Sequence, residues 1–263
     1  MRIDFGRVWA VVLKEIRDYR HNRLIIVTMA LLPVIFVIVP TVNLFTLSAS
    51  SSSTVVHAQV GSSMLLLLLL PVIVPATIAA YSVVGEREQG TLEPLLTTPI
   101  SRDELLLGKA LAAVVPAVAI TYILFAIVVV GVRIVGASVV VHAVWQAPQF
   151  LAELLFAPLL ATWAIWIGMA ISARSSDIRV SQQLGTLASL PALAITTLIS
   201  YRIISPTLAL AFGLAAAILV IDVFAWRIAS RMFDRERLIL GRPAQPRSKR
   251  GATTAGEPGT GSA

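Results

Sequence analysis

Six long apolar stretches, almost free of charged side chains, decide what this chain can fold into. They occupy residues 24–47, 64–84, 110–131, 151–171, 184–200 and 207–226. A helix of about 20 apolar residues crosses the roughly 30 Å hydrocarbon core of a bilayer. The sequence therefore predicts an all-α membrane protein with six transmembrane helices and a transmembrane domain over residues 24–226.

The remaining residues leave little room for a separate catalytic domain, because they are divided among short loops, an N-terminal segment and a polar tail. The chain has no cysteine, which excludes disulfides and thiolate metal sites. An intramembrane enzyme such as a protease needs paired aspartates, a Ser/His pair or a metal set at membrane depth. His21, His57 and His142 all lie outside the predicted spans, so we predict no catalytic residue and no metal site.

The positive charges predict the orientation. Of the 21 Lys and Arg residues, all but Arg133 and Arg202 lie before the first span, after the sixth, or in the loops that follow the second and fourth. Positively charged loops stay on the cytoplasmic side, which predicts a multi-pass protein of the cell membrane with both termini cytoplasmic. The same alternation argues against a nucleic-acid-binding surface as the reason for the net charge of +7.

Residues 1–23 carry an apolar stripe at helical spacing, formed by Phe5, Trp9, Val12, Ile16 and Tyr19. This pattern predicts an amphipathic helix that lies in the cytoplasmic interface and leads into the first span. A soluble helix packed on a partner is the alternative. At the other end, residues 227–240 form a basic juxtamembrane segment. Residues 241–263 are predicted to be a disordered cytoplasmic tail, because they lack aromatics and aliphatics larger than alanine.

The loop between spans two and three, residues 85–109, contains the clearest turn and helix-capping signals of the sequence. Gly90 permits a sharp reversal, and Thr91 can cap a short helix whose first turn carries Glu93. Ser101 and Glu104 form an S-x-x-E capping box, which predicts that the third span begins as a helix in the cytoplasm. The short helix either docks into another subunit or simply connects two spans.

The string EREQGTLEPLLTTPISRDELLLGK resembles the cytoplasmic signature of permease subunits of ABC-2 type ABC transporters. The resemblance covers about 25 residues closely, and the other spans agree only in layout. It implies two permease chains, identical or related, and two ATPase subunits that bind ATP and Mg²⁺. It also implies a coupling helix seated in the ATPase subunit, an N-terminal connecting helix, and export of a hydrophobic or amphipathic substrate that is drug-like or lipid-like. The residues that would form or position the ATPase contact are Glu86, Arg87, Glu88, Gly90, Thr91, Leu92, Glu93, Leu95 and Leu96.

The chain itself carries no phosphate-binding loop. The pair Gly108 and Lys109 is similar to the end of such a loop, but Ala110 stands where Ser or Thr is required and Asp103 where the first glycine belongs. The sequence therefore predicts a permease that binds no cofactor and takes its energy from a separate ATPase subunit.

Two acidic residues, Glu153 and Asp222, stand inside otherwise uncharged spans. Both lie near the ends of their spans, so we expect carboxylates that reach the headgroups, with Arg227 assisting Asp222. The functional alternative is an intramembrane proton or cation site, or a polar lining for a substrate path. Two other classes of protein stay open from the sequence: an ion-coupled secondary transporter, and a membrane anchor that transports nothing.

Overall fold

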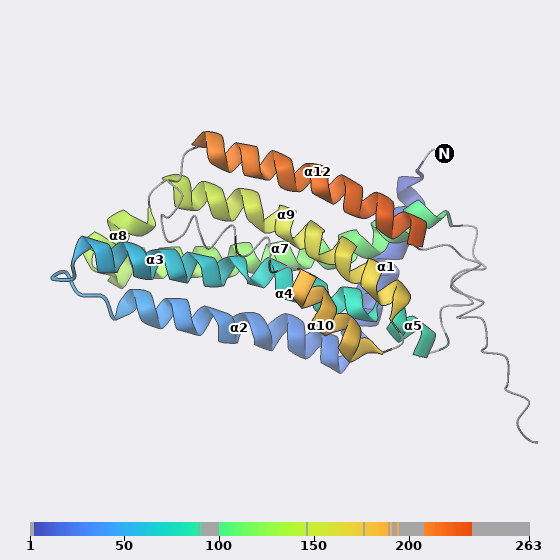
Figure 1. The fold of residues 1–263 in the computed structure, drawn as a ribbon. Coiled ribbons are helices and arrows are strands. Elements are labelled where there is room, and N and C mark those ends of the chain that lie inside the picture. The colour runs from blue at the N-terminus through green and yellow to red at the C-terminus, as the bar shows by residue number, and fades with distance from the viewer. Residues whose placement is uncertain are drawn as a thin grey trace, which may run out of the picture.

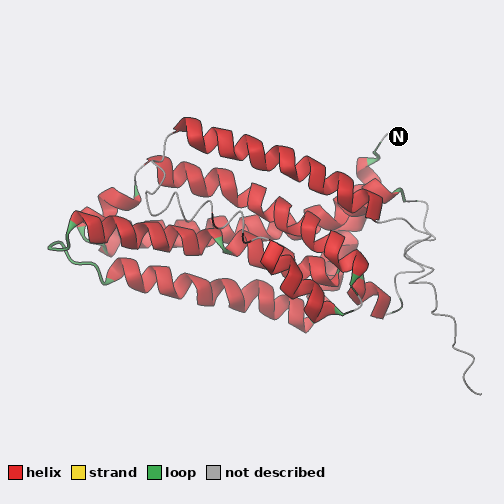
Figure 2. Ribbon diagram, in the orientation of Figure 1, coloured by secondary structure: helices red, strands yellow, loops and turns green. Residues whose placement is uncertain are grey.

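The computed structural model describes residues 3–88, 90, 100–145, 147–175, 177–188, 190, 194 and 208–232. Within these ranges the chain is helical and contains no strand (Figure 2). The helices are α1 (Phe5–His21), α2 (Arg23–Phe45), α3 (Ser53–Leu68), α4 (Leu70–Tyr81), α5 (Val84–Glu88), α7 (Arg102–Val135), α8 (Ser138–Val144), α9 (Ala147–Arg174), α10 (Ile178–Ala188) and α12 (Leu208–Met232).

The long helices lie side by side as a bundle, and α1 crosses one end of it (Figure 1). The same end, called the α1 end below, carries α5 and the last turns of α9 and α12. The short helix α8 lies at the opposite end, beside the connection from α2 to α3. The N-terminal helix and the last described turn of α12 therefore share one end of the bundle, as expected for two termini on one side of a membrane.

Five helical segments of the described residues are long and apolar enough to cross a membrane. They are Ile25–Phe45, Ser53–Glu86, Arg102–Val135, Glu153–Arg174 and Ala209–Arg231, and they correspond to the first, second, third, fourth and sixth predicted spans. Most of the fifth predicted span, residues 184–200, lies outside the described residues, and α10 contains its first turn.

The second candidate span, Ser53–Glu86, contains the predicted span over residues 64–84 and extends it at both ends. The helix begins before the apolar run, and several polar side chains of these earlier turns are half-buried or buried, including His57, Gln59 and the fully buried Ser63. The helix breaks at Leu69, two residues before Pro71, which has no amide hydrogen to donate. The two parts, α3 and α4, nevertheless follow each other through the bundle (Figure 1).

The tightest packing joins α4 to α9. Gly168 faces Ala79, and a Cβ added at Gly168 would overlap the Ala79 methyl group. One turn further along α9, the Ser172 hydroxyl donates to the Ala80 carbonyl at 2.8 Å. The same oxygen accepts the backbone amides of Val83 and Val84, each at 3.3 Å. The small residue allows close approach, and the hydroxyl pairs backbone groups that the helix end would otherwise leave unsatisfied.

Candidate functional site

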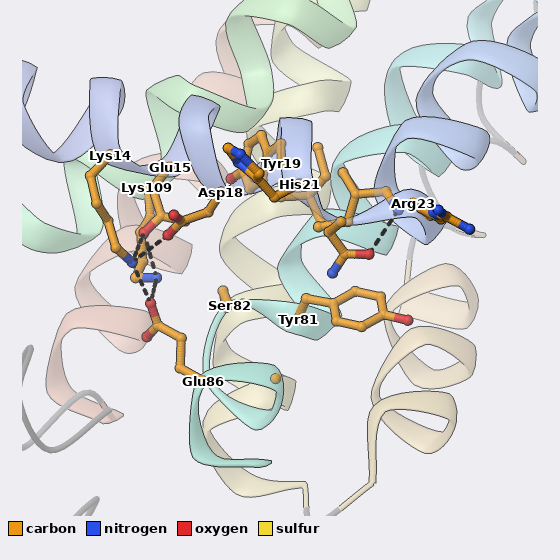
Figure 3. A pocket seen from close by; sticks show the side chains of 14 residues that line it. Lys14, Glu15, Asp18, Tyr19, His21, Arg23, Tyr81, Ser82, Glu86 and Lys109 are labelled. Carbon is orange, nitrogen blue, oxygen red and sulfur yellow. Dashed lines mark hydrogen bonds and ion pairs between the residues drawn. The ribbon is translucent and has the colours of Figure 1, made fainter. Parts of the chain in front are cut away.

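A group of charged side chains, three of them buried and one half-exposed, joins three helices at the α1 end. Lys109 of α7 donates to Glu15 of α1 at 3.0 Å and to Glu86 of α5 at 2.7 Å. Lys14 of α1 reaches the same two carboxylate oxygens, each at 3.1 Å. We call these four residues the lysine–glutamate cluster (Figure 3). With two ammonium groups and two carboxylates it is neutral, which is the condition for burying charge away from water.

The cluster is positioned by the way α1 packs on α7. Asp4 caps α1, because its side chain accepts the amide of Gly6 at 2.8 Å. Helical spacing then places Val8, Val11 and Glu15 on one buried face. Gly108 of α7 allows the contact, since an added Cβ there would lie 2.6 Å from Val11 Cβ. Lys109 follows Gly108 directly and is thereby placed beside Glu15.

A second polar contact fixes the start of α7. The predicted capping box is confirmed: Ser101 accepts the Glu104 amide at 3.3 Å, and Glu104 accepts the Ser101 amide at 2.8 Å. The other Glu104 oxygen accepts the backbone amide of Asp4 at 2.9 Å. The capping box thus also fastens the first residue before α1. On the far side, Asp103 accepts the Ser230 hydroxyl of α12 at 2.6 Å.

Electrostatics stabilise the charged forms within the cluster. Burial on its own would lower the pKa of Lys14, but Glu15 and Glu86 raise that pKa above its usual value. Burial would likewise raise the pKa of Glu15, but Lys109 and Lys14 hold it below its usual value. Lys14 also binds Asp18 at 3.0 Å, one turn along α1. The α1 side of the cluster is therefore ionised at neutral pH.

The cluster contains one predicted site residue, Glu86, which is 8% exposed. Gly90 has a φ of 68°, the left-handed conformation expected for the reversal after α5. Arg87 and Glu88 belong to α5, but their side chains lie outside the described part. The other predicted contact residues, and with them the predicted coupling helix, also lie outside it: Thr91, Leu92, Glu93, Leu95 and Leu96.

Sequence reasoning missed the other three members of the cluster. From the sequence, Lys14 is interpreted only as a cytoplasmic positive charge, Lys109 is interpreted as such a charge and as part of a rejected phosphate-binding loop, and Glu15 is not singled out. A signal was present, because Glu15 lies at helical spacing from Val8 and Val11 on a face distinct from the exposed Phe5 and Trp9. Two apolar faces on one helix indicate that one face contacts the bundle and the other contacts the membrane surface.

The predicted stripe of α1 is accordingly divided. Phe5, Trp9 and Ile16 are exposed, as expected for a helix lying on a membrane surface. Val12, the middle residue of the predicted stripe, is 4% exposed and faces the bundle, so its placement on the membrane side was wrong. The exposed stripe runs instead through Leu13.

The expected surface position of the two intramembrane carboxylates is wrong. Glu153 of α9 is 1% exposed and Asp222 of α12 is 3% exposed. None of their carboxylate oxygens has a hydrogen-bond partner, and no ion pair joins Asp222 to Arg227 among the described residues. Their helices turn them toward neighbouring helices, which sequence position along a span does not reveal.

The geometry defines a class of protein: a multi-pass helical membrane protein whose loop between spans two and three is anchored at both ends to an N-terminal amphipathic helix. The profile of the family described as "ABC-2 family transporter protein" matches residues 9–234. The chain belongs to this family. The recognition of an ABC-2 permease from the loop sequence is confirmed.

Two relatives are similar to this chain over part of their length. Both are named "Probable ABC transporter permease protein NosY", one from Stutzerimonas stutzeri and one from Pseudomonas aeruginosa. Each is 32% identical over 108 residues, which make up 40% of this chain. The matched stretch spans 37% of the first relative and 38% of the second, so it covers less than two fifths of either.

Proposed function

We propose that this permease is the membrane-spanning subunit of an ATP-driven exporter of a hydrophobic or amphipathic substrate. A separate ATPase subunit, which binds ATP and Mg²⁺, docks on the cytoplasmic segment 85–109. Two ATPase subunits and a second permease chain, identical or related, complete the transporter. The permease chain converts movement of the ATPase pair into movement of its own helices.

The lysine–glutamate cluster is the observation that carries this proposal. Glu86 lies one residue after the segment begins, and Lys109 is its last residue. The two are in direct contact at 2.7 Å, and both contact Glu15 or Lys14 of α1. A push on the segment therefore acts on α5, α7 and α1 together, because these three helices share one ionic contact.

The docking half of the proposal is tested by co-purification with the ATPase subunit. Leu95→Asp places a charge on the apolar face expected for the coupling helix, and Glu93→Arg reverses a charge beside it. We expect both variants to lose at least tenfold in ATPase binding and in ATP-driven transport into vesicles. Glu257→Arg makes the same charge change in the tail and should leave both unaltered. Undiminished binding by the two loop variants would overturn the proposal.

The transmission half needs a different variant. Lys109→Met removes the ammonium that joins Glu15 and Glu86 but leaves residues 91–96 unaltered. We expect the ATPase subunit to bind it normally and to hydrolyse ATP, while less substrate moves per ATP. A fixed ratio of transport to hydrolysis would show that the cluster does not transmit the movement.

The substrate class is supported by the scarcity of charge within the described spans, where Glu153 and Asp222 are the buried groups that can ionise beyond the α1 end. The test is transport of a fluorescent amphipathic dye and of a short-chain fluorescent phospholipid into inverted vesicles. ATP-dependent accumulation of either one supports export of this class. If neither accumulates while ATP is hydrolysed, the substrate belongs to another class.

The same two carboxylates favour one alternative, an ion-coupled carrier, because a buried carboxylate that has no partner among the described residues is a natural site for a proton or cation. This alternative predicts transport in vesicles without ATP when an ion gradient is imposed, and loss of that transport in Glu153→Gln or Asp222→Asn. The exporter predicts no transport under these conditions.

A further inference from the structure

A cleft of about 600 Å³ opens beside the lysine–glutamate cluster, between the last turn of α1, the first turn of α2 and the last turn of α4 (Figure 3). Ile25, where the first candidate span begins, and Glu86, where the second ends, both line it. Since one span enters the hydrocarbon and another leaves it at these walls, the cleft lies at the depth of the lipid headgroups.

The wall opposite the cluster carries an unused cation. Arg23 is exposed, and no hydrogen bond or ion pair to its guanidinium occurs in the described part of the chain. In Figure 3 its side chain points away from the cluster, to the same side as the Tyr81 hydroxyl. The lysines of the cluster differ, because both are held by Glu15 and Glu86.

The chemistry of the cleft changes along its length. Asp18, which also pairs with Lys14 at 3.0 Å, lines it on the side of the cluster and Arg23 lines the opposite wall, so its lining carries charges of both signs. Ile25 and Ile78 add apolar lining. Tyr81 also lines the cleft. Phosphate is bound well by an arginine fork and by the positive end of a helix, and α2 begins at Arg23.

We propose that this cleft binds the headgroup of a phospholipid from the surrounding leaflet, of the zwitterionic amine-bearing kind. Arg23 contacts the phosphodiester, the ammonium lies toward Asp18, and the start of the acyl chains follows Ile25 and Ile78. A phosphodiester next to an ammonium matches a cleft that offers both signs of charge and an apolar exit. The proposal concerns a resident lipid and is independent of the transported substrate.

The test is native mass spectrometry of the delipidated full-length chain in detergent, titrated with dioleoyl phosphatidylethanolamine. We expect Arg23→Gln to weaken binding about tenfold and Arg23→Lys, which keeps the charge but loses the fork, to weaken it less. Arg20→Gln is the matched control, since Arg20 is exposed three residues away and does not line the cleft. An equal thermal stability of the four proteins shows that the variants are folded.

Three other probes identify the ligand. Dioleoylglycerol lacks the phosphate, and phosphatidylglycerol lacks the ammonium, so both should bind the wild type more weakly. Water-soluble glycerophosphoethanolamine lacks the acyl chains and should also bind weakly. Binding of Arg23→Gln as tight as wild type would overturn the proposal. So would equal binding of dioleoylglycerol or of phosphatidylglycerol, and equal binding of glycerophosphoethanolamine would indicate a site for a soluble phosphate ester instead.

Discussion

Replacement of Lys109 by methionine is the sharpest test of how the α1 end is held together. The Lys109 side chain is 2% exposed, and its ammonium lies 3.0 Å from a Glu15 oxygen and 2.7 Å from a Glu86 oxygen. Methionine fills much of the same volume, so the change removes the charge with little loss of packing. Two carboxylates then share only Lys14, whose side chain is 40% exposed.

The cost follows from these distances. Both carboxylate oxygens are bound to one nitrogen, which places them within about 6 Å of each other. Two like charges at that distance repel by about 3 kcal/mol at an effective dielectric constant of about 20. Breaking a buried ion pair costs about 3–5 kcal/mol, and the remaining contacts of Lys14 at 3.1 Å reduce that loss. We expect Lys109→Met to lower the free energy of unfolding by about 3 kcal/mol.

The assay is reversible unfolding in mixed micelles with increasing sodium dodecyl sulfate, followed by circular dichroism. Lys249→Met, the same substitution in the tail, is the control and should have no effect. Adding Glu86→Gln to Lys109→Met removes one of the repelling carboxylates, so the double variant should be at least 1 kcal/mol more stable than the sum of the two single effects. A change below about 0.5 kcal/mol for Lys109→Met, or strict additivity in the double variant, would refute the reasoning.

Three further results are expected. Because the pKa of Glu15 is lowered in the folded protein, ionised Glu15 stabilises the fold fully above the usual glutamate pKa of 4.5, and this stabilisation is lost as the pH falls below that value. Denaturant titrations at decreasing pH should show this loss of stability in the wild type and less of it in Glu15→Gln. Gly168→Ala should lower the free energy of unfolding by about 1–3 kcal/mol in the same micelle assay, and adding Ala79→Gly should restore part of the loss. Gly213→Ala is the control and should not destabilise, because there is open space around Gly213; no rescue by Ala79→Gly would mean that α4 and α9 do not meet at these residues. Trp9, 61% exposed, should be quenched by brominated lipids in a variant that keeps no other tryptophan, and quenching only by aqueous iodide would place α1 away from the bilayer.

Much of this architecture could be predicted because the responsible signals are local. The S-x-x-E box is a contact between residues three apart, and the start of α7 at Arg102 agrees with it. The left-handed Gly90 follows from the tolerance of a single residue for positive φ. Apolar runs long enough to cross a bilayer predicted six spans, and five of these correspond to candidate spans among the described residues.

The pairing of charges could not be predicted, because it depends on contacts between residues distant in sequence. Glu15 and Lys109 are separated by 94 positions, and their contact depends on the crossing of α1 over Gly108. The sequence also did not predict that Glu153 and Asp222 are buried, for a related reason. Position along a span gives depth in the membrane, whereas burial depends on which neighbour each helix face meets, and single-sequence periodicity is weak in spans that are apolar all round.

The unbroken run of α7 from Arg102 to Val135 has a mechanical consequence. At a rise of about 1.5 Å per residue its 34 residues extend about 51 Å, well beyond the roughly 30 Å of hydrocarbon. A rod of this length acts as a lever: pivoting it by about 10° about its foot displaces its other end by about 9 Å. A small rotation of α7 at the α1 end would in this way displace the opposite end of the bundle by about the width of a helix.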